Sequence, residues 1–202
     1  MLILLNRWPR WAVRLFSIGA LVLGCWLVDI GVAGSRTASA QDAMTNAEEV
    51  TIDAFVPWQG RGFTFPTGET QGTFVGMFHG PVYIKTEKGP AEGGLIVCPA
   101  MLDFNLETGK QIGYGKCTIA GEEGHRVFAE WSCQGIRLVG CKGEFKVTGG
   151  TGRFEGIVGT GPMVSRAGLH IGAADNVGSI VQEEAQGLII LDGLKLKLPA
   201  KE

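Results

Sequence analysis

The sequence predicts an all-β protein, a single antiparallel β-barrel of about eight strands that follows a cleaved signal peptide. Three observations predict it. Apolar residues recur at every second position in most segments after residue 50, which is the period of a strand with one buried face. Glycine makes up 32 of the 202 residues without a triplet repeat, which is typical of all-β domains with many turns and bends. The first forty residues have the pattern of an export signal.

The export signal has three parts. Arg7, Arg10 and Arg14 are basic, residues 15–28 are uncharged and mostly apolar, and Ala38-Ser39-Ala40 is a small-x-small cleavage motif. The apolar run is shorter than the roughly 20 residues that a spanning helix needs. We therefore expect a signal peptide over residues 1–40, a flexible lead-in over 41–49 and the barrel domain over 50–202.

Two alternatives for the leader remain open. Val22-Leu23-Gly24-Cys25 weakly resembles the lipidation motif of a lipoprotein. A retained membrane anchor is the other alternative, and Asp29 within the apolar stretch counts against it. A cleaved leader predicts a periplasmic or secreted protein. Contact with a membrane is expected only if the leader is retained or lipidated.

Charge and motifs exclude several function classes. Without the four basic and one acidic side chains of the leader, the chain carries 14 basic and 19 acidic side chains, a net charge of −5. No block of like charge is present, so nucleic acid is not expected as a partner. The glycine-rich segment 149–161 lacks the glycine spacing and the Gly-Lys-Ser/Thr of phosphate-binding loops. No cofactor is expected.

The expected strands are separated by turn residues, and no helix is expected. Proline and glycine end the first segments at Pro57, Pro66 and Gly80-Pro81. Residues 165–186 are the least periodic part of the chain and are expected to form a long loop. Strands are expected over residues 50–56, 62–65, 72–78, 82–86, 95–104, 111–119, 126–134, 139–147, 153–158 and 188–198.

The clearest local prediction is a hairpin over residues 138–161. Lys142, Glu144 and Lys146 form its wet face, Gly149-Gly150-Thr151-Gly152 its turn, and Arg153 begins the return strand. The expected buried face consists of Val139, Cys141, Phe145 and Val147. Strands joined by such short connections form either a sandwich or a closed barrel. We favour the barrel, because it has no sheet edges and its interior can hold one small ligand.

Residues 144–156, EFKVTGGTGRFEG, with Gly159 beyond them, resemble the strand–turn–strand signature of the allene oxide cyclase and dirigent barrels. The resemblance implies a calycin-like, eight-stranded barrel with a central apolar cavity, and often an oligomer. It also implies hydrophobic lipid-derived or phenolic intermediates as substrates or guests. The catalytic residues of that family cannot be placed on this chain.

Four cysteines follow the leader, an even number that favours disulfides in an exported protein. We expect the pairs Cys98–Cys117 and Cys133–Cys141, because each would join neighbouring strands, although the sequence also allows two other pairings. No Cys-x-x-Cys motif or spaced histidine is present, so no metal site is expected.

Few residues are candidates for chemistry. Glu130, His79 and Asp103 are weak catalytic candidates. Glu130 alternates with Trp131, and we favour a buried Trp131 with a solvated Glu130, because burial of an unpaired carboxylate is costly. The weak ligand-binding candidates are Trp131, Phe145 and Met77. The doublet Glu183-Glu184 is expected to be solvated and next to a turn.

Three functions fit these features. The first is an exported barrel that binds a small apolar molecule in its interior. The second is a cyclase or isomerase that confines a hydrophobic intermediate in the same cavity, which the family resemblance implies. The third is a structural or assembly protein without a ligand, acting through contacts of a homo-oligomer. Whether the protein is an enzyme stays open.

Overall fold

The computed structural model describes residues 48–177 and 180–198, and for residues 169–177 the backbone alone. The predicted signal peptide and residues 41–47 of the predicted lead-in lie outside these residues. Glu48 and Glu49 already pair with Leu198 and Lys197, so the first strand begins inside the predicted lead-in. No helix in the described part of the chain is long and apolar enough to cross a membrane.

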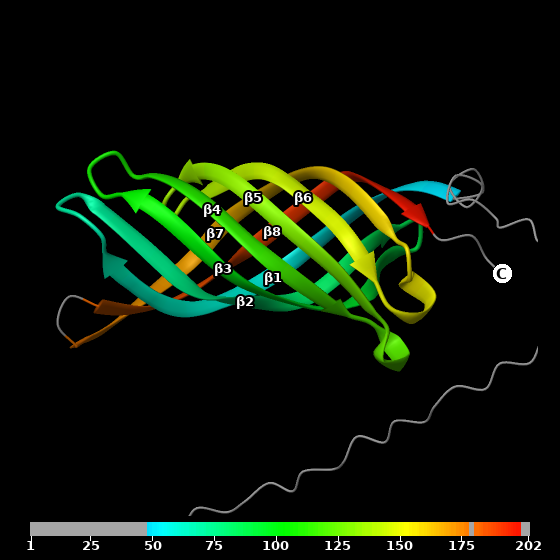
Figure 1. Ribbon diagram of the computed structural model, residues 1–202, viewed down its shortest axis with the longest axis horizontal. Helices are drawn as coiled ribbons and strands as arrows, with labels where there is room; N and C mark the ends of the chain where they lie inside the picture. The colour runs from blue at the N-terminus through cyan, green and yellow to red at the C-terminus, as the bar shows by residue number, and fades with distance from the viewer. Residues whose placement is uncertain (1–47, 178–179, 199–202) are drawn as a thin grey trace, which may run out of the picture. The chain divides into compact units, whose positions relative to one another are not determined.

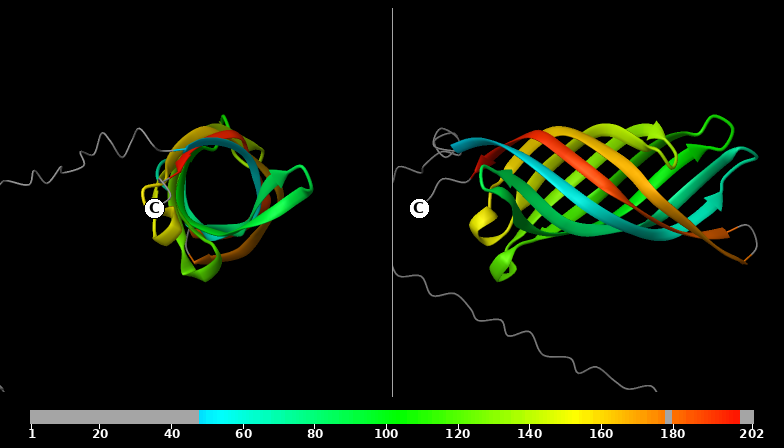
Figure 2. Two further views of the ribbon diagram at one scale, coloured as in Figure 1. Left: turned by 90° about the vertical axis from the view of Figure 1, so that its right-hand side faces the viewer. Right: turned by 180° about the vertical axis from the view of Figure 1, so that it is seen from behind.

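Eight strands form one closed antiparallel barrel (Figures 1 and 2). Each strand pairs with its neighbours in sequence, and the last strand also pairs with the first, so the predicted barrel is confirmed and the sandwich is excluded. The strands are β1 (Glu48–Pro66), β2 (Gln71–Thr86), β3 (Gly89–Asn105), β4 (Lys110–Ala120), β5 (Arg126–Ile136), β6 (Gly140–Gly150), β7 (Val158–Val177) and β8 (Ile180–Leu198).

Two predicted breaks do not end strands. β1 continues through Pro57, where its pairing with β2 is interrupted between Phe55 and Gln59 while the pairing of Pro57 with Leu188 of β8 continues. A proline is tolerated there because it lacks only the N–H that the interrupted ladder would use. β2 likewise continues through Gly80-Pro81, with Pro81 opposite Leu95.

The predicted loop over residues 165–186 is wrong. This segment forms most of β7 and the first part of β8, which pair with each other from Ala167–Gly187 to Val177–Ile180. The register shifts between Ala167 and His170 and again between Ala173 and Val177. Such bulges interrupt the two-residue period, so a strand here gives no regular apolar pattern.

The hairpin over residues 138–161 is confirmed with two corrections. Cys141, Phe145 and Val147 are buried as predicted, but Val139 is 51% exposed because it lies in the turn before β6. The return strand begins at Val158, and a short 3-10 helix at Gly152–Phe154 takes the place of its predicted start. Ile157 completes the connection as part of the core.

Both predicted disulfides are present. Cys98–Cys117 joins β3 to β4, and Cys133–Cys141 joins β5 to β6. All four cysteines are buried and belong to the core inside the barrel. The two bridges therefore cross-link two adjacent pairs of strands from within.

The two ends of the barrel differ. Because neighbouring strands are antiparallel, the β1–β2, β3–β4, β5–β6 and β7–β8 connections lie at one end, and the chain enters and leaves the barrel at the other (Figure 1). We call the first end the mouth. The other end is filled by aliphatic side chains, among them Val56, Ile96, Val147, Leu191 and Leu194.

Candidate functional site

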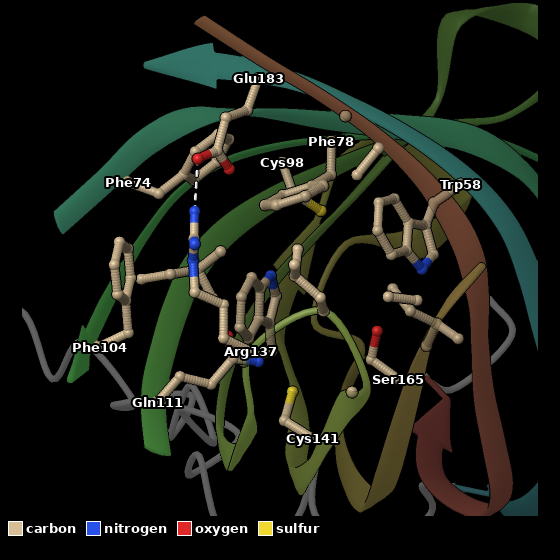
Figure 3. A pocket seen from close by; sticks show the side chains of 18 of the residues that line it. Trp58, Phe74, Phe78, Cys98, Phe104, Gln111, Arg137, Cys141, Ser165 and Glu183 are labelled. Carbon is tan, nitrogen blue, oxygen red and sulfur yellow. Dashed lines mark hydrogen bonds and ion pairs between the residues drawn. The ribbon is translucent and has the colours of Figure 1, made fainter. Parts of the chain in front are cut away.

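A cavity of about 110 Å³ lies in the barrel interior toward the mouth (Figure 3). Every strand of the barrel contributes to its wall, so it belongs to the lumen and not to a groove between two strands. The wall is formed by Trp58, Gly60, Phe74, Phe78, Cys98, Leu102, Phe104, Gln111, Trp131, Arg137, Leu138, Gly140, Cys141, Met163, Ser165, Ala167, Glu183, Ala185 and Ile189.

Aromatic rings dominate this wall. Phe78 is central: its ring centroid lies 5.1 Å from that of Trp58, 5.8 Å from that of Phe74 and 6.5 Å from that of Trp131. The Trp58 and Trp131 contacts are edge-to-face, an arrangement that the ring quadrupoles favour. The rings form a continuous apolar surface over β1, β2 and β5.

Glycines of neighbouring strands make room for these rings. A Cβ atom at Gly60 would lie 2.4 Å from the ring of Phe78, and one at Gly72 would lie 2.6 Å from the ring of Phe104. A Cβ at Gly187 would lie 2.7 Å from the indole of Trp58. These rings therefore lie close against the backbone of the neighbouring strands.

An ion pair crosses the mouth of the cavity. The guanidinium of Arg137, from the β5–β6 turn, donates to the carboxylate of Glu183 on β8 (Figure 3). The two side chains are 20% and 12% exposed. Thr64 Oγ1 donates to the same carboxylate at 2.9 Å, and the Arg137 Cζ atom lies 4.0 Å from the ring centroid of Phe104. These contacts connect β1 and β8 to β3 across the barrel.

The β5–β6 turn is held in place by backbone hydrogen bonds. The N–H of Arg137 donates to the carbonyl of Gly109 at 2.8 Å, and the N–H of Ala167 donates to the carbonyl of Val139 at 3.1 Å. Leu138, between Arg137 and Val139 in the turn, has a φ of 61°. This left-handed conformation costs a non-glycine residue roughly 1–2 kcal/mol. The strained turn places both Arg137 and Leu138 on the cavity wall.

One polar atom of the wall lacks a hydrogen-bond partner. Trp58 is 7% exposed, and no acceptor within the described residues lies in reach of its Nε1–H. In Figure 3 the indole nitrogen is directed toward the side of the cavity where Ser165 lies. Buried N–H groups without a partner are rare and cost about 1–3 kcal/mol.

The structure brings only one of the predicted ligand-binding candidates to the cavity. Trp131 lines it, whereas Phe145 is part of the packed core and Met77 is 50% exposed on the outer wall. Met77 points outward because it alternates with Phe78, which points inward.

None of the predicted catalytic candidates lies in the cavity. Glu130 points outward and accepts a hydrogen bond from Lys146 at 3.0 Å, as the favoured interpretation of the Glu130–Trp131 alternation requires. Asp103 is exposed and accepts from Thr73 at 2.7 Å, and His79 is exposed on β2. These three residues occupy outward-facing strand positions, so the two-residue period separates them from the lumen.

Sequence reasoning missed Glu183. Its neighbour Glu184 is on the outer wall and pairs with Arg61 at 2.7 Å, so the two glutamates of the doublet face opposite sides. The prediction that both are solvated beside a turn is wrong for Glu183. The inward series Glu183, Ala185, Gly187, Ile189 and Leu191 alternates regularly, but it is out of step with Leu194, Leu196 and Leu198, which face the interior further along β8. The register shift where Leu191 and Leu194 pair with Ala54 and Ile52 causes this offset, so extending the period of the predicted last strand would have placed Glu184 inside instead.

Residues 48–177 and 180–198 contain no cluster of three or more histidine, cysteine, aspartate or glutamate side chains that could hold a metal ion. The charged side chains of the cavity wall are Arg137 and Glu183, and they form a pair. The site is therefore an apolar cavity whose mouth is crossed by the Arg137–Glu183 ion pair.

Comparisons with known proteins show no family for this chain. No family model matches it, and no curated protein matches it. Among solved structures it is similar to the pterocarpan synthase dirigent protein, with 9% sequence identity and a TM-score of 0.30, over 82% of this chain and 99% of that chain. At these values the match carries no argument about activity. The barrel is established by the strand pairing of the chain itself, and a relationship to allene oxide cyclases stays a prediction.

Proposed function

We propose that the protein is exported and binds one small apolar molecule inside the barrel. The observation that carries this proposal is the aromatic cavity of about 110 Å³. Natural ligand pockets are concave and mostly apolar, with a few polar groups that orient the ligand. The cavity has this composition, with five aromatic rings and the polar side chains of Trp58, Gln111 and Ser165.

The charges of the wall support binding better than catalysis. A general acid or base must reach the substrate with an exchangeable proton. Arg137 and Glu183 form hydrogen bonds with each other, and Glu183 also accepts from Thr64. A cyclase or isomerase activity in this chamber would have to break that pair first, whereas binding does not.

Export is part of the proposal because of the two disulfides. Structural disulfides persist in oxidising compartments and are rare in the cytosol. Cys98–Cys117 and Cys133–Cys141 are consistent with a periplasmic or extracellular location, as the leader predicts.

Native mass spectrometry of the full chain, purified from its own cells without denaturation, tests the proposal and also gives the oligomeric state. We expect a small molecule that remains bound under native conditions and is released on denaturation. Ala185→Leu, which extends a side chain into the cavity, should abolish this extra mass. Ala120→Leu, at an exposed position of β4, is the matched control and should keep it. Equal retention by both variants, or no bound molecule in the wild type, contradicts the proposal.

A further inference from the structure

The position of the Trp58 indole is imposed by the strands beside it. Trp58 lies opposite Gly187 of β8. A Cβ at Gly187 would lie 2.7 Å from Cζ2 and 2.8 Å from Cε2 of the indole, so the ring crosses β8 at the place where a side chain is missing. Cε2 is bonded to Nε1, so the indole nitrogen lies beside Gly187 of β8.

The edge-to-face contact with Phe78 holds the indole from its other side. The two ring centroids are 5.1 Å apart, with planes at 89°. The indole is thus enclosed between Gly187 and Phe78, and its nitrogen cannot turn to the solvent without displacing one of them. Trp58 remains 7% exposed and lines the cavity, and its Nε1–H is buried without a partner among the described residues.

A donor fixed in this way selects the chemistry of its guest. A guest without an acceptor leaves the desolvated N–H unpaired, whereas an oxygen that accepts from it removes that penalty, and a single hydrogen bond contributes about 0.5–1.5 kcal/mol net. Ser165, on β7 at the side toward which the indole nitrogen is directed, offers its hydroxyl as a second polar contact to the same part of a guest.

Size and charge restrict the guest further. An engineered apolar cavity of about 150 Å³ binds benzene in another protein, so a cavity of about 110 Å³ limits the guest to one ring, and a short substituent would extend toward the mouth. Arg137 and Glu183 neutralise each other, and a charged guest would lose its hydration without gaining a free counter-charge. An uncharged molecule is favoured.

We propose that the cavity binds an uncharged, single-ring molecule whose oxygen accepts a hydrogen bond from Nε1–H of Trp58. This inference rests on the proposed function and adds the chemical class of the ligand. It assigns Trp58 as the residue that distinguishes an oxygenated guest from a hydrocarbon of the same shape.

The test compares two probes of nearly equal shape, acetophenone and α-methylstyrene, in which a carbonyl oxygen is exchanged for a methylene group. Their affinities are measured by NMR titration of the full-length wild type and of Trp58→Phe, which keeps a ring but removes the donor. We expect Trp58→Phe to lower the affinity for acetophenone about fivefold, from the net value of one hydrogen bond. The affinity for α-methylstyrene should change less than twofold. Trp131→Phe removes an indole from the same wall and is the control: it should leave the ratio of the two affinities unchanged.

A second readout uses the wild type alone and does not depend on the folding of a variant. The Nε1–H resonance of Trp58 should move downfield with acetophenone and not with α-methylstyrene. If both probes bind but the affinity ratio is the same in wild type and Trp58→Phe, or the resonance responds equally to both, the inference is overturned and the proposed function stands. If neither probe binds the wild type, both are overturned.

Discussion

At the residue scale, the absence of a side chain at Gly60 leaves the space that the ring of Phe78 occupies. A Cβ atom there would lie 2.4 and 2.6 Å from two atoms of that ring. The Phe78 ring is in turn the centre of the aromatic wall, in contact with Trp58, Phe74 and Trp131. A single methyl group at this position therefore affects the whole cavity.

We predict that Gly60→Ala destabilises the protein by about 1–3 kcal/mol, the usual cost of overpacking, because Phe78 must leave its place against the wall. Gly149→Ala is the matched control, since a Cβ at Gly149 meets nothing within 4 Å. It should change the free energy of unfolding by less than about 0.5 kcal/mol. Urea denaturation of both variants measures the difference. Equal effects would show that Phe78 does not lie over Gly60.

The doublet Glu183-Glu184 allows a comparison of two ion pairs on opposite faces of one strand. Arg137–Glu183 is mostly buried, with side chains 20% and 12% exposed, whereas those of Arg61–Glu184 are 70% and 41% exposed. Removing one partner of a buried pair leaves a charge in a poorly solvated place, which costs far more than the loss of a surface pair.

We expect Arg137→Met to lower the free energy of unfolding by about 2 kcal/mol, less than the value for a fully buried pair because some solvent reaches it. Arg61→Met should cost less than about 1 kcal/mol. Urea denaturation at low and at high salt checks both, and the smaller effect should decline further as salt screens the exposed pair. If Arg61→Met lowered the free energy of unfolding as much as Arg137→Met, the burial of the Arg137–Glu183 pair would be contradicted.

At the element scale, the two disulfides link β3 to β4 and β5 to β6. Their cysteines are 19 and 8 residues apart in the sequence. In the chain-entropy model a disulfide stabilises by restricting the unfolded chain, and the effect grows with the length of the loop it closes.

Replacing Cys98 and Cys117 by alanine should therefore destabilise the protein more than replacing Cys133 and Cys141. Each double variant is expected to lose about 2–4 kcal/mol, and the difference between them should be about 0.8 kcal/mol, from the logarithm of the two loop lengths. Urea denaturation of the two double variants gives both values. A larger loss for the shorter loop would mean that packing of the sulfur atoms, and not chain entropy, dominates.

The strands also show which strand boundaries can be predicted from the sequence. The alternation in β4 and β5 is regular, and these strands were predicted with nearly the correct bounds. The predicted last strand covers only residues 188–198 of β8, which begins at Ile180. Pro57 and Gly80-Pro81 are local breakers, but their effect depends on whether a partner strand requires their N–H, which only the register reveals. The bulges of β7 remove the alternation, so the predicted loop there followed from a pattern that is truly irregular.

At the scale of the whole molecule, the closed barrel was predictable because glycine content, strand period and short connections all agree with it. The site was less predictable. Arg137 and Glu183 are 46 residues apart, and Trp58 and Gly187 meet only because β8 closes on β1. Such contacts depend on barrel closure and stagger, which no local pattern encodes. Trp131, in a clearly alternating strand, is the one predicted ligand contact that lies in the cavity.

The central claim is that the lumen near the mouth is an accessible apolar cavity. Apolar cavities of this size bind xenon, so crystals of the protein pressurised with xenon test the claim directly. We predict xenon density inside the barrel, among Trp58, Phe78 and Trp131. A lumen free of xenon, or xenon bound only on the outer wall beside residues such as Val75 and Met77, would contradict it.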